Sequence, residues 1–470
     1  MANGKHTVEK IGGTSMSRFD ELMNNIIIGN RKGAKLYNRI FVVSAYSGIT
    51  NLLLEHKKTG VDGVYSAFKN CDLAWEAKLE GVRDAMLKIN GQFSSLGLPV
   101  DKADQFVNER IDGIKLCLRN LLKIRSYGHL APKDYLPASR EFLSALGEAH
   151  SAYNSVLILQ HNGVNARLVD LTGWKETQTL PINDAIRNAF LGIDLTKELP
   201  VVTGYTKCSE GMMGRFDRGY SEITFSKLAV VTQAREGIIH KEFHLCTGDP
   251  VLFGADKVKV IGHTNFDIAD QLADMDMEAI HSSASKEMEL EDIPIRVKNA
   301  FEPEHPGTLI SRGYISPVPK IDMICGRDDI VAVEIMDSTM VGEAGYDYRL
   351  LKIFNKYGIS YIAKNTNANT ITHYIQEKSD GLEQAIELLK AEFPMGRLTV
   401  YKVAIVCAIG SNMAIPGFLA RGASALAEAG INILAIDQCL RQVNMQFVVK
   451  RESFEKAQIA LHRELVEKIK

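Results

Sequence analysis

Short apolar strands alternate with amphipathic helices through residues 6–312, and this pattern limits the fold class more than any other feature. The order is typical of an α/β protein in which helices cover a mainly parallel sheet. The clearest expected strands are Arg39–Ser44, Ala166–Asp170 and Leu199–Thr203. Between residues 52 and 135 the strand pattern stops, and Leu, Ala, Lys and Glu recur at helical spacing. We therefore expect a helical insertion there, serving as a lid or a dimer surface.

The first expected strand ends in a glycine turn that suits a bound anion. Lys10 precedes the glycines Gly12 and Gly13 and the hydroxyls of Thr14 and Ser15. Glycines let the backbone approach a bulky anion, and loop N–H groups pointing one way form a concave anion site. A lysine beside them adds a positive charge that can follow a phosphoryl group. The spacing differs from that of a Walker A loop, and a strand with an ordinary capped turn is the alternative interpretation.

A second apolar strand, Phe41–Ser44, leads into the Ser/Gly segment Ala45–Asn51 and a Leu-rich helix. Together with Lys10–Ser15, it resembles the aspartokinase family, whose N-terminal motifs read K-x-G-G-T-S and V-V-S-A-x-x-G-x-T-N. The resemblance implies an enzyme that uses ATP and Mg²⁺ to convert L-aspartate into 4-phospho-L-aspartate. It also implies an α/β fold: an amino-acid-kinase-type three-layer sandwich with a mainly parallel sheet, followed by two ferredoxin-like α+β ACT domains.

The resemblance assigns substrate-binding roles to residues beyond the glycine turn. Ser44 and Thr50 match positions that hold the aspartate, although both could be ordinary hydroxyls, with Thr50 as a helix cap. Glu148, near the expected start of a helix that continues to Gln160, matches the glutamate that holds the aspartate ammonium. Glu141 lies about two helical turns earlier and is a rival. His150 is expected to be a packing residue, since it has no second ligand at metal spacing. Ser15, Tyr205 and Ser221 complete the predicted substrate-binding set.

The segment Gly211–Glu222 departs from the family pattern G-R-T-T-T-L-G-R-G-G-S-D. Arg218 remains in place, and its guanidinium suits a bidentate grip on the substrate carboxylate. Tyr220 replaces a glycine and excludes an easy positive φ, so the loop geometry must differ. Glu222 keeps the charge of the family's aspartate with one more methylene. The residues predicted to act in catalysis are Lys10, Gly12, Gly13, Arg218 and Glu222.

The segment Thr247–Asp256 resembles the family's nucleotide side, T-D-V-x-G-x-Y-x-x-D-P-R. Its threonine, aromatic and aspartate positions are kept, whereas D-P-R becomes Asp-Lys-Val. The predicted nucleotide-binding residues are Thr247, Phe253, Asp256 and Lys257. We expect no dedicated protein cage for the metal, because Mg²⁺ usually enters with the nucleotide phosphates.

Residues 313–320 are rich in Gly and Pro and predict a linker. A weak repeat follows, with the order β-α-β-β-α in each copy and helices expected at Tyr346–Tyr357 and Phe418–Ala429. The second copy resembles an ACT domain, which implies a homodimer and an amino-acid effector; two units that only hold a dimer together are the alternative. The expected domains are a catalytic domain (1–312, with the insertion 52–135), a first ACT domain (321–400) and a second ACT domain (401–470).

The effector strand of the first copy differs from that of lysine-regulated members of the family. Their aspartate, which meets the effector's ammonium, is replaced by Ile362. A buried ammonium without its counter-charge is costly, so we expect lysine to inhibit weakly or not at all. Asn365, Thr366, Asn367 and Asn369 could bind a neutral effector instead. This strand and the Arg218–Glu222 loop resemble the aspartokinases found with ectoine biosynthesis.

The composition argues against several other classes of protein. The chain of 470 residues has a net charge of −2, which favours neither nucleic-acid nor acidic-membrane binding. Its 7 cysteines are scattered singly, as in a reducing compartment, and no apolar run is long enough for a membrane span. The N-terminus leaves no room for a signal peptide, and we expect a cytoplasmic, monofunctional enzyme. Two alternatives stay open: a kinase of another small amino acid, and a non-catalytic ACT sensor.

Overall fold

The computed structural model describes residues 4–57, 59–128, 130–216, 219–275, 277 and 280–468. The chain forms two compact units. Unit 1 comprises Met1–His244 and Ile280–Arg312, and unit 2 comprises Leu245–Ala279 and Gly313–Lys470. No helix in the described part of the chain is both long enough and apolar enough to cross a membrane.

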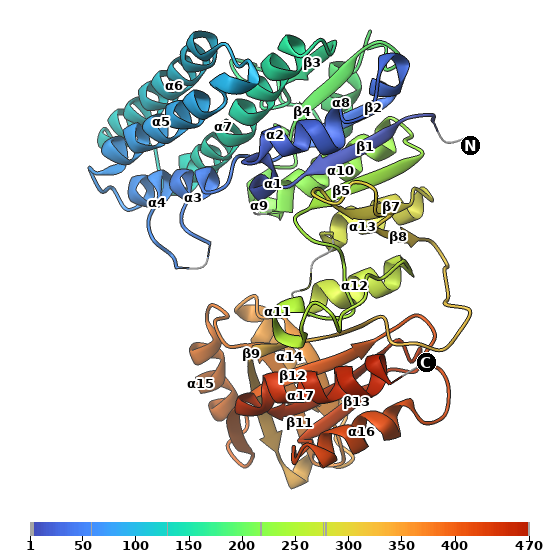
Figure 1. Ribbon diagram of the computed structural model, residues 1–470. Helices are drawn as coiled ribbons and strands as arrows, with labels where there is room; N and C mark the ends of the chain where they lie inside the picture. Colours follow the sequence, from blue (N-terminus) through green and yellow to red (C-terminus); the bar gives the residue numbers. More distant parts are fainter. Residues whose placement is uncertain are drawn as a thin grey trace. The chain divides into compact units, whose positions relative to one another are not determined.

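The strands of unit 1 form one sheet in the order β3-β4-β2-β1-β5-β7-β8 (Figure 1). Neighbouring strands run parallel, except that β8 pairs antiparallel with β7. The prediction of a mainly parallel sheet is thus confirmed. The strands are β1 (Thr7–Ile11), β2 (Arg39–Val43), β3 (Ala166–Val169), β4 (Leu199–Thr203), β5 (Glu236–Lys241), β7 (Ile295–Asn299) and β8 (Thr308–Ser311).

Helices cover both faces of this sheet and complete the three-layer sandwich. Helix α10 packs against β1 and also contacts α8 and α13, whereas α7 packs along β3 and β4. Helix α1 follows β1 after Gly12, and α3 follows β2 after a short loop; both connections lie at the carboxyl ends of the parallel strands. The helices are α1 (Gly13–Met16), α2 (Phe19–Leu22), α3 (Ile49–Leu53), α7 (Pro132–His161), α8 (Ile182–Ala189), α9 (Met212–Phe216), α10 (Tyr220–Val231) and α13 (Ser282–Leu290).

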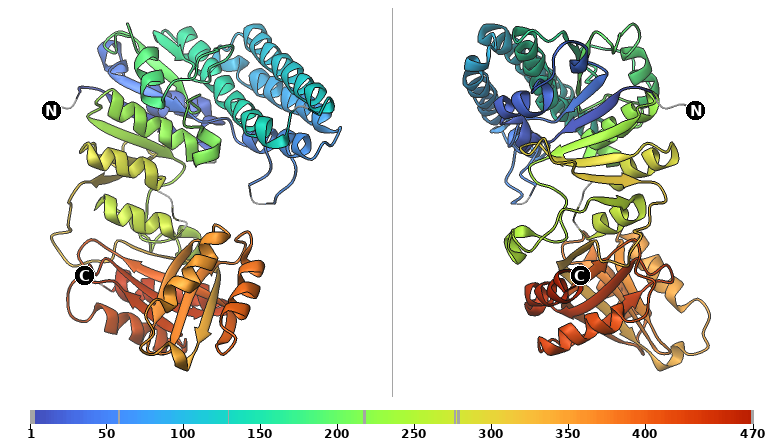
Figure 2. Two further views of the ribbon diagram at one scale, coloured as in Figure 1. Left: turned by 180° about the vertical axis from the view of Figure 1, so that it is seen from behind. Right: turned by 45° about the vertical axis from the view of Figure 1, so that its right-hand side comes forward.

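The stretch 52–135 contains α4 (Val64–Lys69), α5 (Trp75–Gln92) and α6 (Val100–Ser126). Helices α5 and α6 form a hairpin that runs beside α7 (Figure 2). Apolar side chains at helical spacing are buried along the hairpin: Leu79, Val82 and Met86 in α5, and Val107, Ile111, Ile114 and Leu118 in α6.

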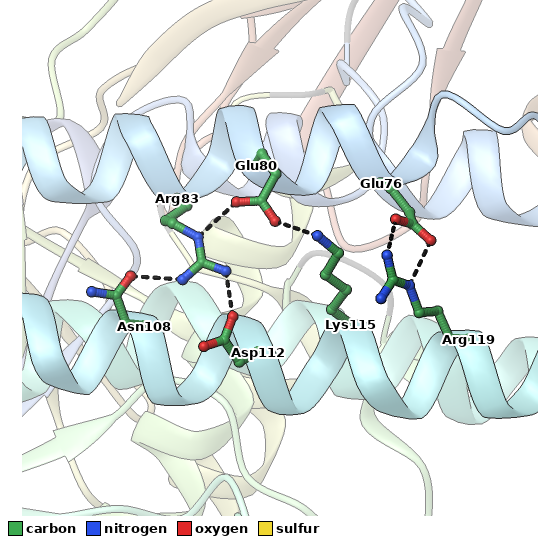
Figure 3. A network of polar contacts seen from close by, with 7 residues as sticks. All are labelled: Glu76, Glu80, Arg83, Asn108, Asp112, Lys115 and Arg119. Atoms are coloured by element: carbon green, nitrogen blue, oxygen red, sulfur yellow. Dashed lines mark hydrogen bonds and ion pairs between the residues drawn. The ribbon is translucent and has the colours of Figure 1, made fainter.

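A polar network joins the outer sides of α5 and α6 (Figure 3). Glu80 accepts from Arg83 Nε at 2.7 Å and from Lys115 Nζ at 2.8 Å, and Arg119 pairs with Glu76. Exposed ion pairs contribute only about 0–1 kcal/mol each, so the buried apolar side chains contribute most of the stability of this hairpin.

Unit 2 contains a sheet in the order β10-β11-β9-β12-β14-β13. The long central strands β9 (Met323–Met336) and β12 (Arg397–Ile409) pair antiparallel from Arg397↔Met336 to Ile409↔Met323. The other strands are β10 (Tyr361–Thr366), β11 (Thr370–Gln376), β13 (Ala435–Gln438) and β14 (Asn444–Lys450). The helices are α14 (Tyr346–Lys356), α15 (Leu382–Glu392), α16 (Phe418–Glu428) and α17 (Phe454–His462).

The two central strands serve two ferredoxin-like units at once. The C-terminal half of β9 begins the first unit, and the N-terminal half of β12 completes it as the fourth strand. In the second unit the roles are exchanged: the rest of β12 begins it, and the N-terminal half of β9 is its fourth strand. Two apolar cores, one under each unit, result from this exchange. The predicted β-α-β-β-α order of each copy is confirmed. Unit 2 also holds α11 (Pro250–Phe253), β6 (His263–Asn265) and α12 (Phe266–Asp274).

Candidate active site

Lys10 lies near the end of β1 and pairs with a glutamate of α10. Its Nζ is 3.2 Å from Glu222 Oε1, and the two side chains are only 11% and 13% exposed. The backbone N–H of His281 donates to Glu222 Oε2 at 2.5 Å. Burial alone would raise the pKa of Glu222, but the charges of Lys10 and Lys241 and this N–H hold it below its usual value. Glu222 is therefore ionised at neutral pH and holds the Lys10 ammonium in place.

The turn after β1 lies directly against the turn after β2. A Cβ on Gly13 would lie 2.5 Å from the carbonyl oxygen of Ala45, so only glycine allows this approach. The N–H of Gly12 donates to the His240 carbonyl at 3.4 Å. Ser15 is fully buried, and its hydroxyl donates to Glu242 at 2.7 Å. The turn thus brings Lys10 and the glycines together as predicted, while Ser15 faces a carboxylate.

Glu148 lies in the middle of α7, and the expectation that a helix starts at this motif was wrong. Helix α7 begins at Pro132, where the Asp134 carboxylate accepts the N–H of Ala131 at 3.0 Å and so caps the helix. Proline suits a first helical position because its missing N–H has no helical partner there. A Cβ on Gly147 would lie 2.6 Å from the Cβ of Ala45, so this glycine lets α7 approach the turn after β2.

The two carboxylate oxygens of Glu148 have different surroundings. The side chain is 1% exposed, and Oε1 accepts the Tyr220 hydroxyl at 2.9 Å. Oε2 is buried and has no hydrogen-bond partner among the described residues. Burial raises the pKa of Glu148 to about 7, although the Tyr220 hydrogen bond, the nearby backbone N–H groups of Glu148 and Ala45 and the charge of Lys10 act in the opposite direction. A buried carboxylate oxygen without a donor suits a cationic ligand.

The rival carboxylate, Glu141, already has protein donors on both oxygens. Its Oε2 accepts the Tyr205 hydroxyl at 2.6 Å, and its Oε1 accepts the N–H of Met213 at 2.7 Å. Glu141 therefore anchors the loop that carries Tyr205 to α9. His150 is buried against Asn90, with 2.7 Å between Nε2 and Oδ1, and burial lowers its pKa to about 3. It is a neutral packing residue, as predicted.

The remaining predicted substrate residues lie at the ends of β2 and α10. The carbonyl of Ser44 accepts the Ser151 hydroxyl at 2.9 Å. Thr50 lies inside α3, whose N-cap position is occupied by Gly48 at φ 85°, so the alternative of a Thr50 cap was wrong. Ser221 is buried in the first turn of α10. Arg218 lies outside the described residues.

The predicted nucleotide residues belong to unit 2, whereas Lys10 and Glu148 belong to unit 1. Thr247 Oγ1 lies 3.2 Å from His462 Nε2 in α17, and the Phe253 ring stacks on the same imidazole at 4.2 Å between centroids. Both residues are buried in unit 2, while Asp256 and Lys257 are exposed. The segment thus packs on the second ferredoxin-like unit.

Neither Glu242 nor His281 was among the predicted site residues, and Tyr220 was expected only as a departure from the family pattern. A phenol in place of glycine next to Glu222 was the available signal. Ser15 and Glu242 are 227 positions apart and Glu222 and His281 are 59 apart, so no local pattern predicted these two pairings.

Fold and site together define the class of the protein. A mainly parallel α/β sheet carries Lys10 near the carboxylates of Glu222 and the buried Glu148, and two fused βαββα units follow. This combination defines an amino acid kinase with ACT domains. The amino acid kinase family model matches residues 5–299, and an ACT domain model matches residues 406–465.

Two curated relatives span most of the chain. Aspartate kinase Ask_Ect of Stutzerimonas stutzeri is 52% identical over 464 residues, which cover 98% of each chain. Aspartokinase 3, chloroplastic, of Arabidopsis thaliana is 26% identical, with 90% of this chain and 75% of that protein covered. The chain belongs to the amino acid kinase family and, within it, to the aspartate kinases.

Solved structures agree on the fold. E. coli aspartokinase III in complex with aspartate and ADP matches with a TM-score of 0.75 at 21% identity, covering 98% of this chain and 100% of that one. The same enzyme with lysine and aspartate matches with a TM-score of 0.71 at 22% identity, covering 99% and 100%.

Proposed function

We propose that the enzyme transfers the γ-phosphoryl group of ATP to the side-chain carboxylate of L-aspartate, giving 4-phospho-L-aspartate and ADP. A carboxylate oxygen forms the new bond to phosphorus as the bond to the ADP oxygen breaks. The acceptor is ionised at neutral pH, since its ordinary pKa is about 3.9, so the step requires no general base. The protein has to align the two substrates and neutralise the phosphoryl charge.

The observation that carries this proposal is the placement of Lys10 and Glu148 in one unit. Lys10, held by Glu222, compensates the charge that develops on the phosphoryl oxygens, and Gly12 and Gly13 let the phosphate approach the backbone. Glu148 Oε2 takes the ammonium of aspartate. Arg218 is proposed to bind the carboxylate of aspartate that is not phosphorylated. The surrounding hydroxyls are those of Ser15, Ser44, Thr50, Tyr205 and Ser221.

ATP is proposed to contact the segment that matches the family's nucleotide side through its exposed residues Asp256 and Lys257, while the buried Thr247 and Phe253 hold this segment in place against His462. Among the described residues, no three His, Cys, Asp or Glu side chains converge as a metal site. Mg²⁺ is proposed to be held mainly by phosphate oxygens, because it usually enters such sites with the nucleotide.

Unit 2 is proposed to form a homodimer interface and to bind an amino-acid effector. Asn365, Thr366 and Asn367 line a cavity of about 480 Å³ together with Glu334 and Tyr374, which suits a small polar ligand. We further propose that the enzyme works in the cytoplasm, in the ectoine pathway; the aspartate-family pathway is the alternative.

The test is ATP-dependent aspartyl hydroxamate formation, in which hydroxylamine traps the acyl phosphate. We expect Lys10→Ala to lower kcat roughly a hundredfold or more, as for loss of a charge-stabilising group. Lys227→Ala is the matched control, because Lys227 forms a comparable half-buried ion pair with Glu287, at 2.6 Å, elsewhere in unit 1. No product from folded wild-type enzyme that still binds amino acids would indicate a sensor; product with another acceptor would indicate a different amino acid kinase.

A further inference from the structure

Tyr220 is a buried tyrosine at the first position of α10. Its side chain is 2% exposed, and its hydroxyl donates to Glu148 Oε1 at 2.9 Å. Its ring meets the Tyr205 ring edge-on, with 5.7 Å between centroids. The phenol is thus contributed by α10, whereas Glu148 belongs to α7.

This contact makes the two oxygens of Glu148 unequal. The carboxylate plane is fixed once one oxygen is anchored by a buried donor, because rotation would break that hydrogen bond. The other oxygen, Oε2, is the one without a hydrogen-bond partner among the described residues. A carboxylate anchored in this way presents a single oxygen to an incoming cation.

We propose that Tyr220 is a positioning residue for substrate binding: its hydroxyl holds Glu148 Oε1, so that Oε2 faces the ammonium of aspartate. The inference rests on the role proposed above for Glu148. An opposing possibility is that Tyr220 competes with the substrate for Glu148, and the two cases predict opposite changes in KM.

The charge state of Glu148 gives this proposal a pH signature. Among the residues that the structure describes, the titratable side chains that face Glu148 are Lys10 from β1, Tyr205 from the loop after β4 and Tyr220 from α10. Burial raises the pKa of Glu148 to about 7, and the Tyr220 hydrogen bond lowers it. Only the ionised carboxylate pairs with an ammonium, so KM for aspartate rises as the pH falls through this pKa. Without the phenol hydroxyl, the pKa of Glu148 increases and the rise in KM starts at a higher pH.

The experiment compares Tyr220→Phe with wild type from pH 6 to pH 9, with kcat and KM for aspartate measured separately. We expect KM at pH 7 to increase roughly fivefold, the effect of a pKa raised by about one unit from about 7, with kcat nearly unchanged. This excess shrinks toward pH 9, where both enzymes carry an ionised Glu148. An unchanged or lower KM, or an increase that is equal at every pH, would overturn the proposal.

The matched control is Tyr346→Phe, which removes a buried tyrosine–carboxylate hydrogen bond in unit 2, from Tyr346 to Asp337 at 2.8 Å. We expect its pH profile of KM to follow that of wild type. Glu148→Gln separates the two levels of the argument. If it leaves KM unchanged, the role of Glu148 fails; if it raises KM while Tyr220→Phe does not, only the inference about Tyr220 fails.

Thermal unfolding shows whether Tyr220→Phe is folded. Should it not fold, 3-fluorotyrosine at position 220 is the second variant, since its phenol is more acidic and a stronger donor. It is expected to move the KM midpoint to lower pH, and an unmoved midpoint would overturn the proposal.

Discussion

The face of β1 opposite Lys10 carries a buried charge cluster whose disruption can be predicted. Glu9 is 3% exposed and accepts Arg39 Nε at 2.7 Å and Arg39 Nη2 at 3.0 Å. His240 Nε2 lies 2.8 Å from Glu9 Oε2. Arg39 also donates to the carbonyls of Ile26 and Ile27, both at 2.9 Å. The cluster thus ties β1, β2 and β5 to the segment after α2.

We expect Arg39→Met to lower the free energy of unfolding of unit 1 by about 3–5 kcal/mol, since it leaves a buried carboxylate without its cation. Glu9→Gln together with Arg39→Met should recover part of this loss, because no buried charge then remains. Although burial opposes it, Arg39 and His240 hold the pKa of Glu9 well below its ordinary value. This stabilisation is therefore complete above the unfolded pKa of about 4.5 and is lost as the pH falls through the lowered folded value.

Urea unfolding followed by tryptophan fluorescence measures this effect. Both tryptophans of the chain, Trp75 and Trp174, belong to unit 1, so the signal reports on that unit. Arg187→Met is the control, because it removes only an exposed ion pair with Asp184 and should cost less than about 1 kcal/mol. If Arg39→Met costs no more than this control, the cluster does not stabilise the sheet and the reasoning is refuted.

Two further outcomes are expected. Gly147→Ala should weaken aspartate binding and lower the melting temperature, because the new Cβ would lie 2.6 Å from the Cβ of Ala45 and push α7 away from the β2 turn; unchanged kinetics and stability would contradict this close packing. Lysine should inhibit weakly or not at all, since Ile362 supplies no counter-charge for its ammonium. A lysine titration that reaches full inhibition at physiological concentration would refute this expectation.

The fold could be predicted well because its signals are local. The apolar run Leu199–Thr203 forms a strand that is buried on both faces of the sheet, with the expected ends. The expected strands Arg39–Ser44 and Ala166–Asp170 also form, and each ends one residue earlier than predicted. The exchange of strand halves between β9 and β12 could not be predicted, because pairing over such a sequence distance leaves no periodic trace. The start of α7 was also predicted at the wrong position. The helix begins at Pro132, with Asp134 in its first turn, whereas the prediction placed its start near the motif at Gly147.

The candidate site, in contrast to the fold, could be predicted from the sequence only in part. Motif spacing located Lys10 and Glu148, but the roles of their neighbours depend on contacts between distant segments. Tyr220 and Glu148 are 72 positions apart, and Lys10 and Glu222 are 212 apart, so only folding brings each pair together. A residue that breaks a family pattern cannot be judged from the pattern alone. Tyr220 removes the freedom of a glycine but adds a buried donor, and whether that donor aids or blocks the substrate depends on which oxygen of Glu148 it leaves open.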